Sequence, residues 1–452
     1  MRLSRYAIVG VEQDHAWLFG AVRGDFAWLP RDWGLALAEG RLDPLPPRLR
    51  VALLRRGFLV PDGVDEYAAA LRRVRLRRAR QPLNLIVVPT YACNLRCGYC
   101  YAQDVAFRPD PRADGDRGDD LRSRLAAFLE RRLPALQDRR LTLALFGGEP
   151  LLRSGACLAL ARECAQAAAR HGARFFCTLT TNGSLLDDDT RCLFAHLSSC
   201  QVTLDGVGAD HDRYRHGAAG EGSYERIVAF VRAASEAGVG VGIRFHLHPE
   251  FDPRGWPDAA ARLRRDLGPL NKLTLYFADV SPGGFRETIG CDHWGPGHAP
   301  SVERAPVREA FLQAGWPAEQ VQLNLAGNDD LVLDRRCLLV GEGTYLVDGR
   351  GDVYVCPVAL GDAATRLGRL DRAGRLHAPR LQRLTRALTP PRMCAECRLF
   401  PICEMGCLVK AAARRGSLDE PFCERGPLLQ RVREKAQRLR PRGAGAVPAA
   451  TP

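Results

Sequence analysis

The chain has 452 residues, of which 46% are hydrophobic, so it can bury the cores of two or three globular domains. Its formal charge is +13, but only three of its 65 basic residues are lysine, and no helix-turn-helix, zinc-finger or RNA-binding signature accompanies the charge, which argues against a nucleic-acid partner. No apolar run approaches the roughly 20 residues that span a bilayer, and the N-terminus lacks a secretory signal, so we expect a cytoplasmic protein with no membrane partner.

Residues 1–78 are expected to form a small α+β unit. Two segments typical of strands, YAIVGVE and AWLFGAV, precede helical patterns over 46–56 and 64–76. The second helix runs into LRRVRLRRARQ, residues 71–81. This basic run is either a solvated helix end, which is the commoner fate of such runs, or a contact for an acidic peptide.

A regular alternation of strand and helix patterns begins at residue 83. The apolar runs rich in strand formers cover 83–88, 141–146, 174–180, 201–204, 241–247 and 272–278. The helical patterns between them cover 119–136, 156–170, 187–197, 223–237 and 257–267. Such alternation predicts an α/β fold with a parallel sheet, and six units predict a partial (β/α)6 TIM-like barrel over 83–280.

The rest of the chain divides by composition. Residues 281–336 contain SPGG and GPGH and little periodicity, so we expect a linker region. Residues 337–425 hold seven of the 16 cysteines and are expected to form a cysteine-rich domain. Residues 426–452 are expected to be a C-terminal helix followed by a disordered tail.

Three cysteines follow the first predicted barrel strand. In YACNLRCGYCY, residues 91–101, Cys93, Cys97 and Cys100 are spaced C-x3-C-x2-C. Clustered cysteines in a reducing compartment indicate metal binding or catalysis. Three thiolates would leave one iron of a 4Fe–4S cluster open to a small molecule. A zinc site completed from elsewhere is the alternative, but active sites of barrels lie at the C-terminal ends of the strands, which favours the cluster.

Further motifs follow the next strands. Residues 147–150 (GGEP) follow the second strand, 181–183 (TNG) the third, and Asp205 with Gly206 the fourth. Together with the cysteine triplet, in which Tyr99 precedes the third cysteine, these segments resemble the radical S-adenosylmethionine (SAM) family. FGGEP at 146–150 resembles its motif for the methionine amine, and TLDGVGADHDRYRHG at 203–217 resembles a SAM-contacting segment.

This resemblance implies a reaction and a set of SAM contacts. SAM would chelate the open iron, and reductive cleavage would give a 5′-deoxyadenosyl radical that abstracts hydrogen from a substrate. Adjacent glycines let the backbone approach a ligand, a carboxylate suits the amine, and an aromatic ring suits adenine. Strand-end capping is the alternative role for Thr203 and Asp205, and a surface position the alternative for Arg215. The implied SAM contacts are Tyr99, Gly147, Gly148, Glu149, Pro150, Asn182, Thr203, Asp205 and Arg215.

The second cysteine group has the spacing C-x13-G-x4-C followed by C-x2-C-x5-C-x3-C-x15-C. It resembles the SPASM domain, which carries two auxiliary iron–sulfur clusters, although a zinc ribbon also contains C-x2-C pairs. The resemblance implies three 4Fe–4S clusters in all. One auxiliary cluster would be held by Cys394, Cys397, Cys403 and Cys423, and the other by Cys337, Cys356 and Cys407. The fourth place on the latter would be taken by Cys291 or Asp334, or left open.

SPASM enzymes modify peptides and proteins. In the branch that matures sulfatases an aspartate follows the cysteine that matches Cys356, whereas Pro357 follows here. We therefore predict a peptide maturase that oxidatively modifies, by cross-linking, a ribosomally made precursor, with flavodoxin or ferredoxin as reductant. Residues 1–78 would be a winged-helix-like unit that binds the precursor's leader as an added strand, beside AWLFGAV or its neighbour. The alternatives are an anaerobic sulfatase-maturing enzyme and a non-catalytic iron–sulfur electron-transfer protein.

Overall fold

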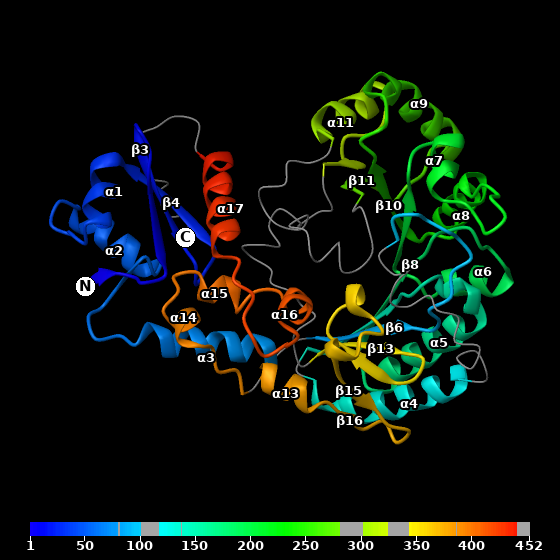
Figure 1. Ribbon diagram of the computed structural model, residues 1–452, viewed down its shortest axis with the longest axis horizontal. Coiled ribbons are helices and arrows are strands. Elements are labelled where there is room, and N and C mark those ends of the chain that lie inside the picture. The colour runs from blue at the N-terminus through cyan, green and yellow to red at the C-terminus, as the bar shows by residue number, and fades with distance from the viewer. Residues whose placement is uncertain are drawn as a thin grey trace.

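The structure is a computed structural model that describes residues 1–79, 82–100, 117–136, 138–280, 302–323, 343–385 and 387–440. Figure 1 shows an N-terminal unit at one end, a curved sheet surrounded by helices at the other, and the cysteine-rich region between them. Cys291, Asp334 and Cys337, which were assigned to an auxiliary cluster, lie outside the described residues.

The N-terminal unit is built on a three-stranded antiparallel sheet in the order β2-β3-β4. The segment AWLFGAV contributes the central strand, so the edges are its neighbours β2 and β4. Alternate residues give the sheet two buried faces, one packed on α1 and α2 and the other on α17. The elements are β1 (Arg2–Leu3), β2 (Ala7–Val11), β3 (His15–Gly20), β4 (Asp25–Pro30), α1 (Arg31–Ala38), α2 (Pro47–Arg55), β5 (Leu59–Val60) and α3 (Glu66–Ala79).

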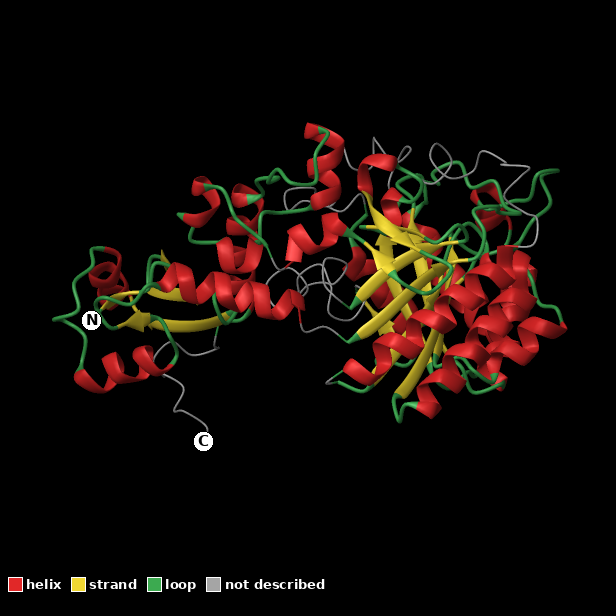
Figure 2. Ribbon diagram, turned by 90° about the horizontal axis from the view of Figure 1, so that it is seen from below, coloured by secondary structure: helices red, strands yellow, loops and turns green. Residues whose placement is uncertain are grey.

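The predicted partial barrel is confirmed: six consecutive parallel strands pair in chain order, with helices on their outer side in Figure 2. The strands are β6 (Leu83–Val88), β7 (Arg140–Leu145), β8 (Arg174–Thr180), β9 (Ser199–Leu204), β10 (Gly240–Leu247) and β11 (Leu273–Asp279). The helices between them are α4 (Arg117–Arg132), α5 (Ser154–Arg170), α6 (Asp188–Phe194), α7 (Ala209–Tyr214), α8 (Tyr224–Glu236) and α9 (Trp256–Leu267).

Both edges of this barrel are extended by segments in which the sequence showed little strand signal. Residues of the expected linker form α11 (Arg304–Gln313) and β12 (Val321–Gln322), which pairs in parallel with β11. On the other edge, β13 (Thr344–Asp348) pairs in parallel with β6 and leads into β14 (Asp352–Tyr354), β15 (Arg366–Leu370) and β16 (Leu376–His377). The cysteine-rich region therefore begins as part of the same sheet.

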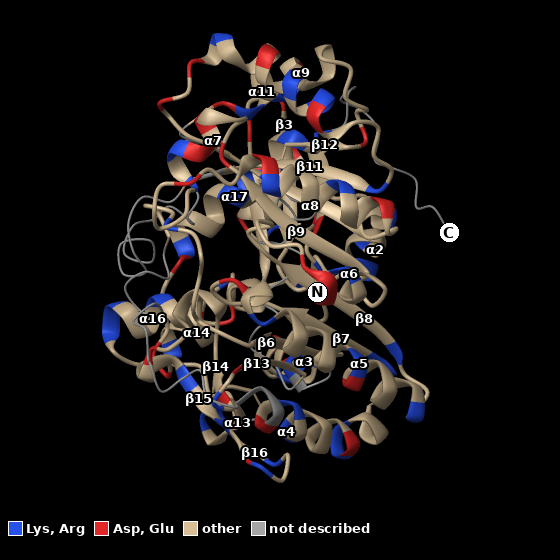
Figure 3. Ribbon diagram, turned by 90° about the vertical axis from the view of Figure 1, so that its right-hand side faces the viewer, with Lys and Arg blue, Asp and Glu red and all other residues tan. Residues whose placement is uncertain are grey.

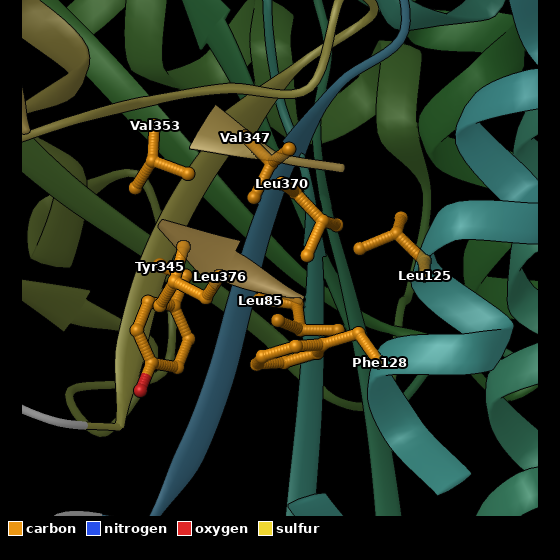
Figure 4. A pocket seen from close by; sticks show the side chains of 8 residues that line it. All are labelled: Leu85, Leu125, Phe128, Tyr345, Val347, Val353, Leu370 and Leu376. Carbon is orange, nitrogen blue, oxygen red and sulfur yellow. The ribbon is translucent and has the colours of Figure 1, made fainter. Parts of the chain in front are cut away.

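Apolar packing fixes this added sheet to the first barrel helix. Phe128 of α4 meets Tyr345 of β13 edge to face, with ring centroids 5.4 Å apart. Figure 4 shows the apolar side chains around a narrow space at this contact, and their close packing marks a structural core rather than a binding site. They are Leu85, Leu125, Phe128, Tyr345, Val347, Val353, Leu370 and Leu376.

The cysteine-rich region ends in helices, most of which contact the N-terminal unit. They are α13 (Pro379–Thr385), α14 (Arg392–Ala395), α15 (Phe400–Cys403), α16 (Leu408–Arg415) and α17 (Arg425–Arg438). One hydrophobic cluster joins β2, β3 and β4 to α3, α15 and α17. The remaining short elements are 3-10 turns at Leu133–Ala135, Pro150–Arg153, Pro253–Gly255, Pro357–Ala359 and Ala363–Thr365.

The basic run at 71–81 has a role that the sequence did not reveal. The Arg75 guanidinium donates to the carbonyl of Leu388 at 2.7 Å. Arg77 and Arg78 both form ion pairs with Glu404, which lies between two predicted cluster ligands. The interpretation of this run as a solvated helix end is therefore wrong for these three arginines, which hold α3 to the cysteine-rich region.

Acidic and basic segments are interspersed on most helices in Figure 3. Across the described part of the chain, no helix combines the length and the apolar character that a membrane span requires.

Candidate functional site

The cysteine triplet lies on the loop that leaves β6. Cys93, Cys97 and Cys100 are all half-buried, and the N–H of Cys100 donates to the carbonyl of Cys97 at 3.1 Å. The loop is also fixed to the segment after α7, because the backbone N–H of Arg96 donates to the carbonyl of His216 at 2.8 Å. Burial raises the pKa of the Cys93 and Cys97 thiols, so a bound cation is needed to keep them as thiolates.

The glycines of GGEP let the second strand end touch this loop. A Cβ on Gly148 would lie 2.2 Å from the carbonyl oxygen of Tyr91 and 2.3 Å from that of Ala92. Gly147 has φ of +148°, and the N–H of Glu149 donates to the Ala92 carbonyl at 2.8 Å. The backbone at 147–149 thus packs directly on the cysteine loop, a contact that side chains would prevent.

Glu149 is fully buried and its carboxylate accepts three hydrogen bonds from the chain. The donors are the N–H of Leu151 at 2.9 Å, the hydroxyl of Thr181 at 2.8 Å and the N–H of Asn182 at 2.7 Å. Burial raises the pKa of Glu149, and these donors oppose that rise. The carboxylate therefore orients the loop after β8 in addition to any contact with a ligand amine.

Asn182 connects that loop to the cysteine triplet. Its Nδ2 donates to the side-chain oxygen Oδ1 of Asn94 at 2.8 Å and lies 3.7 Å from the Cys93 sulfur. Its Oδ1 accepts from Ser184. The predicted cofactor residue Asn182 is thus placed beside a predicted cluster ligand.

A second cluster of polar side chains centres on Asp205, which is fully buried at the end of β9. Its carboxylate accepts from the Tyr99 hydroxyl and from His246 Nδ1 at 2.6 Å, and lies 3.3 Å from His248 Nε2. The Arg215 guanidinium is 3.7 Å away. Burial alone would raise the pKa of Asp205, but His246, His248 and Arg215 hold it well below its usual range.

Three of the predicted SAM contacts therefore meet: Tyr99, Asp205 and Arg215. His246 and His248 join them, and sequence reasoning missed both. The signal was present, since they occupy alternate positions of FHLH at the end of a strand and so point to the same side of the sheet. Thr203 lies on the same face of β9 as Asp205, with no hydrogen bond of its side chain recorded within the described residues.

Arg215 offers an unused donor. Its NH1 donates to the Tyr99 hydroxyl at 2.8 Å, but its Nε is buried without a partner among the described residues, and the side chain is only 8% exposed. A buried donor without a partner is costly unless a ligand supplies the acceptor. The site thus fits a ligand carboxylate next to the cysteine loop.

His211 of α7 connects the backbone of Asp205 to that of Arg215 through hydrogen bonds. The N–H of Asp205 donates to His211 Nδ1 at 3.1 Å, so Nε2 carries the proton and donates to the Ser223 hydroxyl at 2.9 Å. That hydroxyl donates to the carbonyl of Arg215 at 2.6 Å. Protonation of Nδ1 would set two N–H groups against each other, and burial lowers the pKa of His211 to about 4.

This histidine predicts acid sensitivity. The pKa of His211 in the folded protein lies below the unfolded value of 6.5. Its contribution to the free energy of unfolding is therefore complete above pH 6.5 and is lost as the pH falls toward 4. From pH 7 to pH 5 we expect a loss of about 2 kcal/mol in the free energy of unfolding. In His211→Gln, whose amide oxygen can still accept from Asp205, this loss should be absent. Urea unfolding of both proteins at the two pH values checks this, and parallel losses would contradict it.

The second cysteine group divides into two environments. Cys394, Cys397 and Cys403 pack against the hydrophobic cluster shared with the N-terminal unit. Cys356 and Cys407 pack against the core of the barrel. The division matches the two ligand sets implied by the sequence, although the ligand assignment itself stays a prediction.

The set near the N-terminal unit is compact. Burial, with smaller contributions from Glu424 and from the neighbouring Cys394, Cys397 and Cys423, raises the pKa of the Cys403 thiol to about 12. The chain turns sharply after Cys403 through Glu404, Met405 and Gly406, which all have positive φ. A Cβ on Gly406 would meet the Phe422 carbonyl at 1.9 Å, next to Cys423, so glycine brings these segments together.

Cysteine thiolates are the natural ligands of iron–sulfur clusters, and the two groups of cysteines fit that chemistry. No three His, Cys, Asp or Glu side chains converge tightly enough to hold a single metal ion within the ranges that the structure covers.

Residues 87–263 match the family model described as Radical SAM superfamily. The barrel region of the chain is thus a radical SAM domain. This explains why the cysteine loop, GGEP and the Asp205 cluster meet at the C-terminal ends of the barrel strands.

Two kinds of relatives are similar to this radical SAM protein. A GTP 3′,8-cyclase from Pseudomonas savastanoi pv. phaseolicola is 34% identical over 163 residues, which are 36% of this chain and 44% of that protein. The chain thus spans less than half of that relative. The mycofactocin maturase MftC from Mycolicibacterium smegmatis is 26% identical over 384 residues, covering 78% of this chain and 86% of the maturase.

Solved structures share the fold. SuiB from Streptococcus suis, bound to the precursor peptide SuiA, has a TM-score of 0.51 at 15% identity and covers 93% of this chain and 98% of its own. The protein anSMEcpe with bound AdoMet has a TM-score of 0.50 at 17% identity, covering 79% of this chain and 94% of its own. The likeness to SuiB includes most of the described chain, from the N-terminal unit to the cysteine-rich region.

Proposed function

We propose that this protein is a radical SAM/SPASM maturase that oxidatively modifies, by cross-linking, a ribosomally made precursor peptide. The observation that carries the proposal is the packing of three parts into one body. The N-terminal unit shares a hydrophobic cluster and ion pairs with the cysteine-rich region, which in turn continues the barrel sheet. The similarity to the mycofactocin maturase MftC, and to SuiB bound to a precursor peptide, supports the substrate class of the proposal.

The chain's residues would bind SAM at the end of the barrel. When bound, SAM and a reduced 4Fe–4S cluster on Cys93, Cys97 and Cys100 supply a 5′-deoxyadenosyl radical. The buried Nε of Arg215 would donate to the SAM carboxylate. Backbone groups at 147–150 would face its amine, with Glu149 behind them.

Hydroxyl groups of SAM would find their acceptors in the Asp205 cluster. Asp205 is ionised and buried beside Tyr99 and two histidines, so it accepts hydrogen bonds strongly. Burial lowers the pKa of His246, which leaves it neutral beside the carboxylate. Asn182, Thr203 and Tyr99 would complete the contacts to the nucleoside.

The auxiliary clusters would accept the electron that an oxidative cross-link releases. Cys394, Cys397, Cys403 and Cys423 would hold one cluster, and Cys337, Cys356 and Cys407 the other. Flavodoxin or ferredoxin would reduce the SAM-binding cluster.

The leader of the precursor would add a strand to the N-terminal sheet at β2 or β4, the two edges of that sheet. β4 is favoured because Trp28 keeps its buried Nε1 without a partner among the described residues. Hydrogen exchange with and without the peptide locates the site: protection in β4 supports this edge, protection in β2 the other, and protection in neither strand excludes strand addition.

Sulfatase maturation is not favoured. Pro357 directly follows Cys356 and starts a 3-10 turn, so no carboxylate stands at the position where that branch has its aspartate.

Anaerobic reconstitution of the full chain with SAM and dithionite tests the function. We expect 5′-deoxyadenosine, and we expect the peptide encoded by a small neighbouring reading frame to lose two hydrogen atoms per cross-link in its mass spectrum. Failure to form 5′-deoxyadenosine, or iron well below three clusters per chain, would show that the proposal is wrong. SAM cleavage without any change in the peptide would refute the proposal that the protein is a peptide maturase, but not the proposal that it cleaves SAM.

A further inference from the structure

Arg244, whose Nε has no hydrogen-bond partner among the described residues, lies on the concave face of the barrel. Along β10, Val241, Ile243, Phe245 and Leu247 are buried toward the helices as part of the main core. Because side chains alternate across a strand, Arg244 and His246 point to the opposite face, which is the interior of the barrel.

The strand register places Arg244 next to the cofactor residues. It is directly opposite Thr203 on β9 and Tyr276 on β11. His246, two residues further along β10, bonds to Asp205. Arg244 is therefore one layer beneath the Asp205 cluster, on the same side of the sheet.

No group of the described chain neutralises this cation. Arg244 takes part in no recorded ion pair within the described residues, and its Nε is buried without a hydrogen-bond partner. Tyr276, opposite Arg244, donates its hydroxyl to Gln201 at 2.7 Å, and a neutral hydroxyl does not offset the positive charge of the guanidinium. The carboxylate of Asp205, in the neighbouring cluster, already has four partners. Arg244 is partly exposed, so its guanidinium can bind an anion that the described residues do not supply.

SAM is the wrong source for that anion. Arg215 lies close enough to the cysteine loop to lower the thiol pKa of Cys97, whereas Arg244 lowers the pKa of Tyr276 on β11 and of His246, which borders the Asp205 cluster. Arg215 has its own unpartnered Nε for the SAM carboxylate. The position of Arg244, one strand beyond Thr203, is on the side left for the substrate.

We propose that Arg244 binds a carboxylate of the peptide substrate, on the concave face between β9 and β11. This inference rests on the proposed function. In a ribosomally made peptide the carboxylate is either an Asp or Glu side chain or the C-terminus, and both suit the planar, two-pronged guanidinium. The contact would fix one end of the peptide one layer below the predicted SAM site.

The test uses the reconstituted full chain with SAM and two pairs of short peptides. One pair is Ac-Ala-Glu-Ala-NH2 against Ac-Ala-Gln-Ala-NH2, and the other is Ac-Ala-Ala-Ala with a free C-terminus against its amide. Binding is measured by anaerobic calorimetry. We expect the charged member of at least one pair to bind about tenfold or more tightly than its neutral partner, and the pair identifies the source of the carboxylate.

Matched variants locate the effect. Arg244→Gln should abolish the preference and Arg244→Lys should keep part of it, while Arg232→Gln, an exposed arginine on α8, should leave it intact. SAM affinity and cleavage without peptide should be unchanged in Arg244→Gln. Equal binding of both members of each pair, or no binding, overturns the inference, as does loss of SAM affinity in Arg244→Gln. Absence of 5′-deoxyadenosine in the wild type would instead refute the proposed function.

Discussion

Replacement of Cys97 by alanine is expected to abolish the formation of 5′-deoxyadenosine. Cys97 is the middle ligand of a loop whose backbone is fixed by GGEP on one side and by His216 on the other, so no neighbouring thiol can move into its place. The variant should lose about four irons per chain and keep those of the auxiliary cysteines, which lie in separate packing environments. Iron and sulfide analysis with liquid chromatography of the nucleoside products measures both effects.

Cys192→Ala is the matched control, because Cys192 is an exposed cysteine on α6 outside both groups. It should retain full iron content and activity. Zinc instead of iron in the wild type, lost on replacement of Cys97, would support the structural zinc site that the spacing also allows. SAM cleavage by Cys97→Ala at the wild-type rate would contradict the assignment of the loop as the SAM-binding site.

The barrel could be predicted because its signal is local. Each of the six strands is an apolar run bounded by turn residues, and the motifs follow the strands directly, so their meeting at one end of the sheet follows from parallel topology. The strands begin and end within about two residues of the predicted bounds.

Elements that depend on a distant partner were missed. Helix α1 contains Gly34, which weakens its helical pattern, but a Cβ there would lie 2.0 Å from the Cβ of Ala16 on β3. Glycine is needed for that close approach and not for a turn. The short strands β12 and β13 are likewise defined by pairing with β11 and β6 rather than by their own composition.

Polar contacts across the chain were the least predictable. The sequence shows arginines at 71–81 and a glutamate at 404, but nothing in either segment predicts that they form ion pairs with each other. His246 and His248 were also overlooked, because their role depends on Asp205 from the neighbouring strand. Charged groups become informative about function only when their partners are known. Arg78 donates three hydrogen bonds within the described residues, whereas Arg244 has no ion pair there and its Nε has no hydrogen-bond partner.

Replacement of Arg78 by methionine should lower the free energy of unfolding by about 3–5 kcal/mol, the usual cost of removing one partner of a buried ion pair. The Arg78 side chain is 7% exposed and that of Glu404 8%. Arg78 donates to the Glu404 carboxylate at 2.8 Å, to the Glu404 carbonyl at 3.0 Å and to the Leu384 carbonyl at 2.6 Å. Methionine fills similar volume, but it removes the donor of the two buried carbonyls and leaves the Glu404 carboxylate with Arg77 as its remaining arginine partner. Thermal and urea unfolding of the reconstituted chain measure the loss.

Arg73→Met is the matched control, since Arg73 is exposed on the same helix and should cost little. Because Glu404 directly follows Cys403 in a left-handed turn, Arg78→Met should also speed the loss of iron from the auxiliary cysteines nearby, whereas the SAM-binding cluster should be retained. Glu404→Gln should be less harmful, because its amide oxygen still accepts a hydrogen bond while the charge is removed. Equal stability and iron retention in Arg78→Met and Arg73→Met would show that the hydrophobic cluster alone holds the N-terminal unit in place. A selective loss would show that the unit proposed to bind the leader is mechanically tied to an auxiliary cluster.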